Sequence, residues 1–196
     1  MSEIGEKRAG DFQQNNNKKS KTESRHEQRN TRIERKSHDK NFEMITQAKK
    51  IWEQLRRGDI SRDEQKQYMD KIMSIIGGKV QDVIFKHDAS RIIQTCLKKG
   101  NAEQRNQIAE ELKGKYVELA KSMYGKFIVM KAIEYCHKQR DSILSEFRKQ
   151  VRKLIRHKEA STVIETFYSQ FANAAQRNEL LSEFYGPEMT LFNQSG

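Results

Sequence analysis

Apolar residues recur at three- and four-residue spacing along most of this chain, beginning near Asn41. The first stripe stops at Gly58-Asp59 and contains Phe42, Ile45, Ala48, Ile51, Trp52 and Leu55. This pattern predicts an amphipathic helix of about four turns within residues 41–60. The Trp52 ring could stack on a base, but its apolar neighbours at helical spacing favour a packing anchor. We expect this helix to cap the next element.

From Ser61 onward the apolar pattern repeats. A shift of 36 residues places Ile72 on Ile108, Gly78 on Gly114 and Ser90 on Lys126, and a further shift of 35 places Ile108 on Ile143. Each copy has a first helix, a short second segment with an apolar stripe, and a third helix. The third helix opens at a small residue, which is Ala89, Gly125 or Ala160.

A unit of this size cannot bury its apolar face alone, whereas stacked neighbours share a continuous core. With one proline and no alternating β-branched runs, the chain is predicted to be all-α, a curved α-solenoid of three-helix repeats. Tetratricopeptide repeats have a period of about 34 and HEAT or armadillo units are longer, about 40 to 47 residues. The observed period better fits repeats that read RNA one base at a time.

A fourth copy begins but does not reach its third helix. Leu180, Leu181 and Phe184 give the first-helix pattern, and Gly186-Pro187 breaks it. We therefore expect an array of about three and a half repeats over residues 61–196. A non-autonomous fragment of a longer protein is one interpretation of this pattern.

Residues 1–40 are rich in charge and contain almost nothing apolar. Such a segment cannot bury enough surface to offset its ordering entropy, which predicts a disordered basic tail. Within it, Lys18-Lys19-Ser20-Lys21 is a short candidate for nuclear import or phosphate contact, although a solvated tail explains it as well.

The formal net charge is +11, which favours a polyanionic partner, nucleic acid before a membrane surface. Cys96 and Cys136 lie in no CxxC pair and near no histidine cluster, so we expect reduced, buried thiols and neither a disulfide nor a metal site. No apolar run resembles a signal peptide or approaches the roughly 18 residues of a membrane span. We expect a soluble intracellular protein.

The third helices carry the residues that could contact a ligand. One helical face of the first copy presents Ser90, Arg91 and Gln94, while Ile92, Ile93 and Cys96 point away from it. The equivalent positions in the other copies are Lys126, Phe127, Met130 and Ser161, Thr162, Glu165.

Here the sequence resembles the Pumilio (PUF) family, whose repeats place a five-residue window on the inner helix. In that family the first and fifth window positions face a base edge and the second stacks between bases. Ser-Arg-x-x-Gln at 90–94 matches the whole window, and Ser-Thr-x-x-Glu at 161–165 matches its edge positions. The resemblance implies adenine for the former and guanine for the latter.

The chemistry of these side chains agrees with base contact. Gln donates and accepts, Glu accepts, and a guanidinium or phenyl plane stacks on a base for roughly 1–3 kcal/mol with little base preference. Lys126 and Met130 depart from the family pattern, since a lysine suits any acceptor and a thioether accepts only weakly. The middle repeat is therefore expected to discriminate poorly between bases.

A closer likeness, over roughly residues 42–192, is to the nucleolar PUF-A-type branch of that family. It rests on Ile51–Leu55, Phe85–Ala89, Glu111–Val117, Tyr124–Lys126 and Glu183–Glu188. The resemblance implies a nuclear, nucleolar RNA-binding protein that acts in large-ribosomal-subunit biogenesis, and in some members in translational repression of messenger RNA. It implies little base preference and a basic concave face.

The basic side chains just upstream of each window are the candidates for phosphate contact: Lys86, His87, Lys121, Arg156, His157 and Lys158. Binding of this kind weakens steeply with salt. Charged residues at helix junctions can also be merely solvated. Because the cluster recurs beside each third helix, phosphate contact is the favoured interpretation.

Nothing in the sequence points to an enzyme, a cofactor or a small-molecule substrate. There is no phosphate-binding glycine loop, HExxH motif or nucleophile elbow. The acidic pairs Asp63-Glu64 and Glu110-Glu111 are expected on exposed faces, where solvation explains them.

The sequence thus predicts a non-enzymatic RNA-binding module with low sequence specificity. Its expected partners are messenger RNA, pre-ribosomal RNA or another single strand, together with pre-ribosomal proteins. The rival interpretation is an α-solenoid scaffold that docks a partner protein on its inner face.

Overall fold

The computed structural model describes residues 25, 28–31 and 41–186. The chain divides into two compact units, residues 1–43 and 44–196. Of the tail expected at 1–40, only residues 25 and 28–31 are described, and they are helical. The rest of that prediction, including the patch at 18–21, lies outside the described residues.

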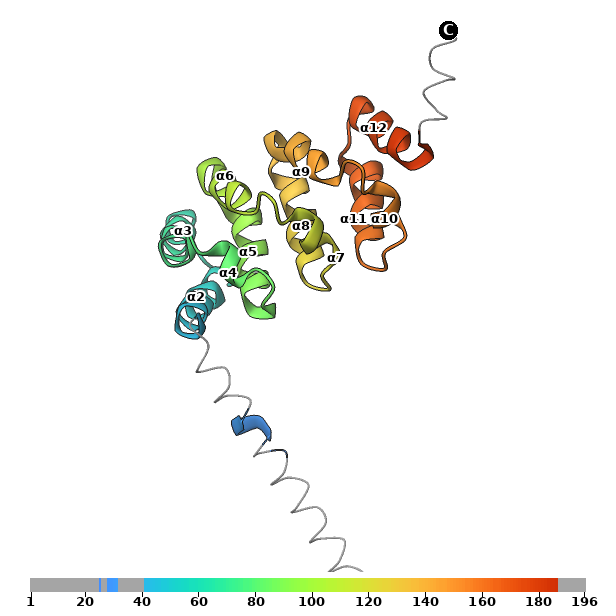
Figure 1. The fold of residues 1–196 in the computed structure, drawn as a ribbon. Coiled ribbons are helices and arrows are strands. Elements are labelled where there is room, and N and C mark those ends of the chain that lie inside the picture. Colours follow the sequence, from blue (N-terminus) through green and yellow to red (C-terminus); the bar gives the residue numbers. More distant parts are fainter. Residues whose placement is uncertain (1–24, 26–27, 32–40, 187–196) are drawn as a thin grey trace, which may run out of the picture. The chain divides into compact units, whose positions relative to one another are not determined.

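Helices form the second unit, and the part of the chain that the structure describes contains no strand (Figure 1). It begins with α2 (Phe42–Leu55), whose first two residues belong to the other unit. Three repeats follow: α3 (Arg62–Ile76), α4 (Val80–Val83), α5 (His87–Lys99); α6 (Ala102–Glu111), α7 (Tyr116–Lys121), α8 (Gly125–Tyr135); and α9 (Arg140–Phe147), α10 (Val151–Ile155), α11 (Ala160–Thr166). A 3₁₀ turn (His137–Gln139) precedes α9, a π-helical turn (Phe167–Phe171) extends α11, and α12 (Ala174–Tyr185) opens a fourth copy. The three-helix repeat expected from the sequence is confirmed.

Three first helices begin at the same local signal. Ser61, Asn101 and Asn173 are N-caps whose side chains accept the backbone N–H three residues later, and a Glu or Gln there accepts the N–H of the cap in return. This capping box satisfies two helix-end donors reciprocally. It explains why α3, α6 and α12 start where they do.

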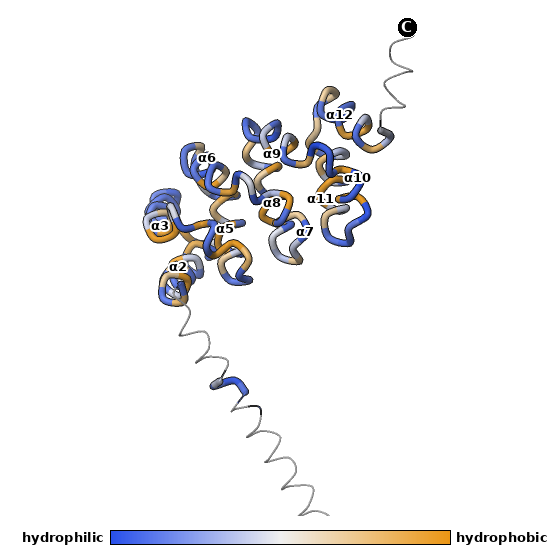
Figure 2. Tube along the Cα trace, viewed as in Figure 1, coloured by the Kyte–Doolittle hydropathy of each residue, from blue (hydrophilic) through white to orange (hydrophobic). Residues whose placement is uncertain are grey.

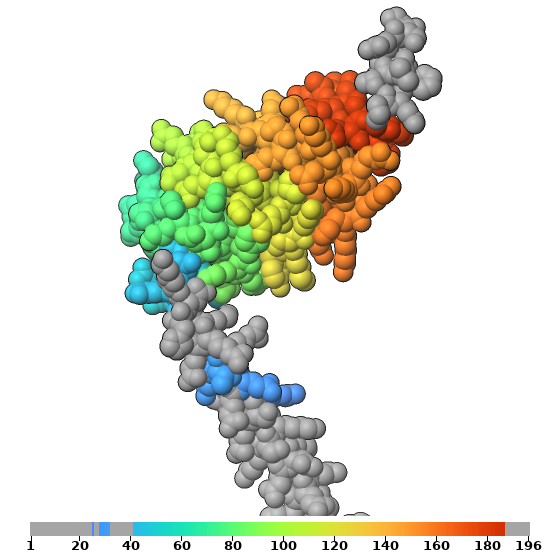
Figure 3. Space-filling view, viewed as in Figure 1, coloured from blue at the N-terminus to red at the C-terminus, as the bar shows by residue number. Residues whose placement is uncertain are grey.

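The core is a continuous row of apolar side chains shared between repeats. Ile72, Ile108, Ile143 and Leu180 occupy one register position and are all buried. Along the tube the apolar segments lie on the facing sides of successive helices (Figure 2), and successive repeats follow one another in order over the surface (Figure 3). Each repeat is therefore stabilised chiefly by its neighbours.

On α6 and α9, a glutamate caps the turn of the preceding repeat. Glu111 accepts the backbone N–H groups of Gly78 and Val80, at 2.8 and 3.1 Å. Glu146 accepts those of Gly114 and Tyr116, at 2.7 and 3.1 Å. The expectation that Glu111 is merely solvated is therefore wrong.

On the same two helices, an arginine makes a second contact with the preceding repeat. Arg105 Nε donates to Leu97 O at 2.9 Å and Arg140 Nε donates to Ile133 O at 2.7 Å. These carbonyls lie near the ends of the preceding third helices, α5 and α8, where intrahelical partners run out. In both kinds of contact, a side chain of one repeat forms hydrogen bonds with backbone groups of the repeat before it.

Trp52 is a packing residue, as its spacing predicted. Its side chain is buried in the core, and its indole N–H donates to Thr95 Oγ1 of α5 at 2.8 Å. Lys99 Nζ of α5 donates to Leu55 O at 2.7 Å. Helix α2 therefore packs on the first third helix.

Both cysteines are buried and free. Burial raises the pKa of the Cys96 thiol to about 12 and that of Cys136 to about 11. A protonated thiol is a poor nucleophile and metal ligand, so both act as core side chains. Among the described helices, none has the length and apolarity needed to cross a membrane.

Candidate nucleic-acid interface

The predicted windows lie on the third helices α5, α8 and α11, at the starts of these helices. A small residue precedes each window because the helix begins against its own repeat: a Cβ on Gly125 would lie 2.8 Å from Leu119 Cδ2. Ala89 and Ala160 are equally buried. This close approach places the three windows at the same register position.

The second window positions form the exposed row of the site. Arg91 and Thr162 are exposed, and Phe127 retains 43% of its accessible surface. The exposed phenyl ring of Phe127 is available for stacking. Arg91 is also oriented by the protein, since its guanidinium carbon lies 5.2 Å from the centre of the Trp52 ring.

The first window positions join the repeats, which departs from the base contacts expected for them. Ser90 is fully buried, and its hydroxyl donates to Tyr124 O at 3.1 Å. Lys126 Nζ pairs with Glu159 Oε2 at 2.7 Å, with both side chains about one-fifth exposed. The hydrogen bond from Lys126 lowers the pKa of Glu159. Their partners lie in the next repeat, so the structure gives Ser90 and Lys126 a structural role.

Ser161 is the third first-position residue, and no later third helix lies among the described residues. Its hydroxyl donates to Lys158 O at 3.3 Å, within its own repeat. Ser161 is half-buried. It is thus the one member of this series whose hydrogen bond stays local.

The fifth window positions differ in what they offer a base. Gln94 is half-buried and donates to Ser90 Oγ at 3.1 Å, which leaves its carbonyl oxygen as an acceptor. Met130 is half-buried and packs against the core. Glu165 is exposed. The middle window therefore presents a ring for stacking and only a weak acceptor at its edge.

The basic candidates upstream of the windows fall into two groups. Exposed side chains capable of phosphate contact are His87, Lys121, Arg156 and Lys158, and Lys86 is a half-buried residue at the N-cap of α5. His157 differs, since its Nδ1 accepts the backbone N–H groups of Glu159 and Ala160 at 3.2 and 3.4 Å. That ring caps the start of α11, which gives His157 a structural role, and phosphate contact at His157 stays a prediction.

Tyr124 is a surface residue that the sequence reasoning did not select. It is 38% exposed, and its ring meets the His87 ring edge-on with centroids 4.6 Å apart. The two rings come from adjacent repeats and lie beside the first two windows. An aromatic residue directly before the small residue of a third helix was the available signal.

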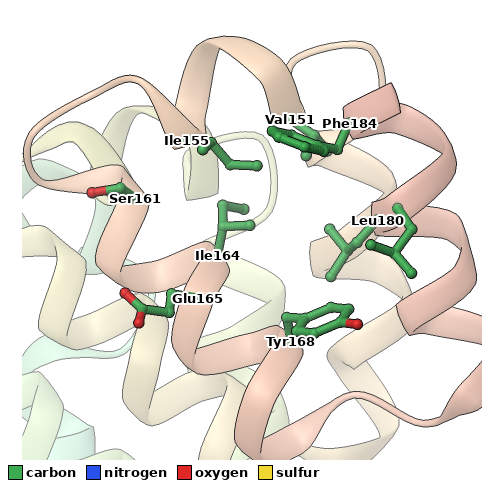
Figure 4. Close-up of a pocket in the computed structure, with 9 residues that line it drawn as sticks. Val151, Ile155, Ser161, Ile164, Glu165, Tyr168, Leu180 and Phe184 are labelled. Atoms are coloured by element: carbon green, nitrogen blue, oxygen red, sulfur yellow. The ribbon is translucent and has the colours of Figure 1, made fainter. Parts of the chain in front are cut away.

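A cleft of about 390 Å³ opens beside the third window, between α10, α11 and α12. Apolar side chains from the three helices face one another across it (Figure 4). Its lining consists of Val151, Ile155, Ser161, Ile164, Glu165, Tyr168, Leu180, Leu181 and Phe184. This lining suits an apolar helix better than a phosphate.

Within the described part of the chain, no three His, Cys, Asp or Glu side chains gather as a metal site would require. The geometry instead offers two exposed planar groups, Arg91 and Phe127, at equivalent positions of successive repeats, with cations nearby. Such an arrangement can stack bases and neutralise phosphates.

Comparison with known proteins supports this interpretation. A family model described as the Pumilio-family RNA binding repeat matches residues 89–113, which contain the first window. Human Pumilio homolog 3 is 38% identical over 156 residues, 79% of this chain and 24% of the relative. Pumilio homology domain family member 6 of Schizosaccharomyces pombe is 38% identical over 147 residues, 74% of this chain and 23% of the relative.

The crystal structure of human Puf-A in complex with DNA is similar with a TM-score of 0.74 and 38% identity, covering 78% of this chain and 30% of that one. The chain spans about a quarter of the length of the curated relatives that it matches. The stacked three-helix repeats, the matched repeat model and these relatives together show that the chain belongs to the Pumilio (PUF) repeat family, in the branch that contains Puf-A.

Proposed function

We propose that this chain is a non-enzymatic module that binds single-stranded RNA with low sequence specificity. The observation that carries the proposal is the exposed row of Arg91, Phe127 and Thr162 on successive third helices, beside a middle window whose edge group is Met130. Stacking contributes about 1–3 kcal/mol per base whatever the base, whereas discrimination needs donors and acceptors at the base edge. The exposed row therefore favours affinity for RNA over recognition of particular bases.

The positive charge supports the same function. The sequence carries a formal net charge of +11, and Lys121, Arg156 and Lys158 are exposed near the third helices. Cations that neutralise phosphates release counterions on binding, so affinity falls with salt. The crystal structure of human Puf-A in complex with DNA agrees with a surface that accepts DNA as well as RNA.

A nucleolar role in large-ribosomal-subunit biogenesis or ribosomal RNA processing, or in repression of messenger RNA, completes the proposal. Its support is the likeness to the PUF-A-type branch together with the basic charge. Pre-ribosomal RNA is then the first ligand to test, with pre-ribosomal proteins as neighbours. A fluorescent fusion that stays out of the nucleolus would contradict this assignment.

Fluorescence anisotropy with labelled oligouridine over a salt series tests RNA binding. We expect the logarithm of the affinity to fall linearly and steeply with the logarithm of the salt concentration. Arg91→Ala and Phe127→Ala should each weaken binding by about 1–3 kcal/mol. The matched control is Arg62→Ala on α3, an exposed arginine outside the three window helices.

A panel of the four homopolymers tests specificity, and a strong preference for one of them would contradict the assignment of the middle window. A second candidate function is a protein-docking scaffold, which the apolar cleft between α10, α11 and α12 favours. Absent or salt-insensitive RNA binding by a folded sample would overturn the RNA proposal and promote the scaffold.

A further inference from the structure

Helix α2 has the register of a third helix. Ala48 is fully buried and takes the place of Ala89, Gly125 and Ala160. Two core-packed residues follow three and four positions later, Ile51 and Trp52, as Ile92 and Ile93 follow Ala89. Leu55, seven positions after Ala48, is as buried as Cys96 seven positions after Ala89. By this register, the window positions on α2 are Lys49, Lys50 and Glu53.

The first-position side chain of α2 reaches the following repeat, as those of α5 and α8 do. Lys49 Nζ lies 3.5 Å from Asp88 Oδ1, the residue directly before Ala89. Ser90 bonds to Tyr124, directly before Gly125, and Lys126 bonds to Glu159, directly before Ala160. Three successive first-position residues therefore reach the same place in the following repeat.

The second position on α2 is Lys50, and it is exposed like Arg91, Phe127 and Thr162. Two arginines add positive charge at the α2–α5 junction, where both lie over Trp52. The guanidinium carbons of Arg56 and Arg91 lie 4.6 and 5.2 Å from the centre of the Trp52 ring. Glu53, the fifth-position residue, is also exposed and adds one carboxylate to this surface.

We propose that α2 is a fourth nucleic-acid contact helix, in which Lys50 binds a backbone phosphate of the strand that passes over Arg91. The inference rests on the proposed RNA-binding function. An ammonium on a flexible stem binds phosphate as a point charge and reads no base. The contact therefore extends the path of the strand by one helix without adding sequence preference.

The test compares Lys50→Ala, Lys50→Arg and Lys66→Ala with the unmodified chain, using labelled oligouridine over a salt series. Lys66 is an exposed lysine of α3, outside the row of window helices. We expect Lys50→Ala to lower the salt slope by about 0.7, the change for one phosphate contact on a single strand. The loss should be equal on all homopolymers, and Lys50→Arg should restore the slope.

Each outcome is informative. If the unmodified chain binds with a steep salt slope and Lys50→Ala matches Lys66→Ala, the fourth contact helix is overturned while RNA binding stands. If the folded, unmodified chain does not bind, both proposals are overturned. Circular dichroism of each variant establishes that the exposed substitutions leave the helices intact.

Discussion

At the residue scale, the turn before each second helix requires a left-handed backbone. Gly78 and Gly114 have φ of 75° and 79°, and Lys149 has φ of 63° at the equivalent position. A residue with a Cβ pays about 1–2 kcal/mol in this region, whereas glycine does not. Lys149 is tolerated because its backbone N–H donates to Glu183 Oε2 of α12 at 2.8 Å, an interaction that does not depend on its side chain.

Lys149→Gly should therefore stabilise the protein by about 0.5–1 kcal/mol, the relief of backbone strain less the extra entropy of a glycine in the unfolded chain. Urea unfolding monitored by circular dichroism measures the change. The reciprocal variant Gly114→Ala should destabilise it by about 1 kcal/mol, since no atom crowds that Cβ and the cost lies in φ alone. Equal urea midpoints of unfolding for Lys149→Gly and the unmodified chain would contradict backbone strain at Lys149.

At the element scale, short second helices depend on carboxylates from the next repeat. Helix α7 has six residues and no side-chain cap of its own. Glu146 of α9 supplies the missing acceptors for the backbone of Gly114 and Tyr116. Since a helix this short is unstable alone, its start is determined by the neighbouring repeat.

Glu146→Gln should cost about 1–2 kcal/mol, because an amide offers only one oxygen and leaves one of the two N–H groups without a strong acceptor. The free energy of unfolding in urea is the measurement. Glu118→Gln is the control: this glutamate pairs with Lys115 on the surface, its side chain is 58% exposed, and its loss should change stability by less than about 0.5 kcal/mol. Indistinguishable costs for the two variants would argue against the capping role.

At the scale of the whole molecule, apolar side chains are exposed at α12, the last helix that the structure describes. One register position is occupied by Ile76, Leu112 and Phe147, which are at most 3% exposed, and then by Phe184, which is 42% exposed. At another register position, Leu97 and Ile133 are at most 1% exposed, whereas Tyr168 is 37% exposed. In the inner repeats the following repeat covers these positions, and no further described repeat follows α12.

We expect Phe184→Ala to cost less than about 1 kcal/mol of stability and to reduce self-association at high concentration, because it removes apolar surface from an exposed patch. Phe147→Ala, at the same register in the core, should cost about 3–5 kcal/mol. Unfolding in urea and concentration-dependent light scattering measure the two effects. Unchanged self-association of Phe184→Ala would show that this patch is not adhesive.

Much of the fold could be predicted from the sequence because the spacing of apolar residues gives the repeat period. The aligned positions Ile72, Ile108 and Ile143 predicted a shared core, and the small residues at 89, 125 and 160 marked the starts of the third helices. The exposed row of second positions followed as well, since helical periodicity separates it from the apolar face. The spacing of apolar residues and the helical face on which a side chain lies are local properties, and the sequence alone determines them.

Only the tertiary structure decided which polar side chains are already hydrogen-bonded within the protein. Ser90, Lys126 and His157 fitted the chemistry of an RNA site, yet their hydrogen-bond partners are Tyr124 and Glu159 of the next repeat and backbone N–H groups of α11. Glu111 fitted a solvated surface, yet it caps the preceding turn. The sequence shows the hydrogen-bonding capacity of a side chain but not its partner. The partners of Ser90, Lys126 and Glu111 lie 31 to 34 residues away and are brought near by stacking, whereas those of His157 lie two and three residues away. Sequence thus determined the repeats and their exposed row, while packing decided which of the window residues remain available to a ligand.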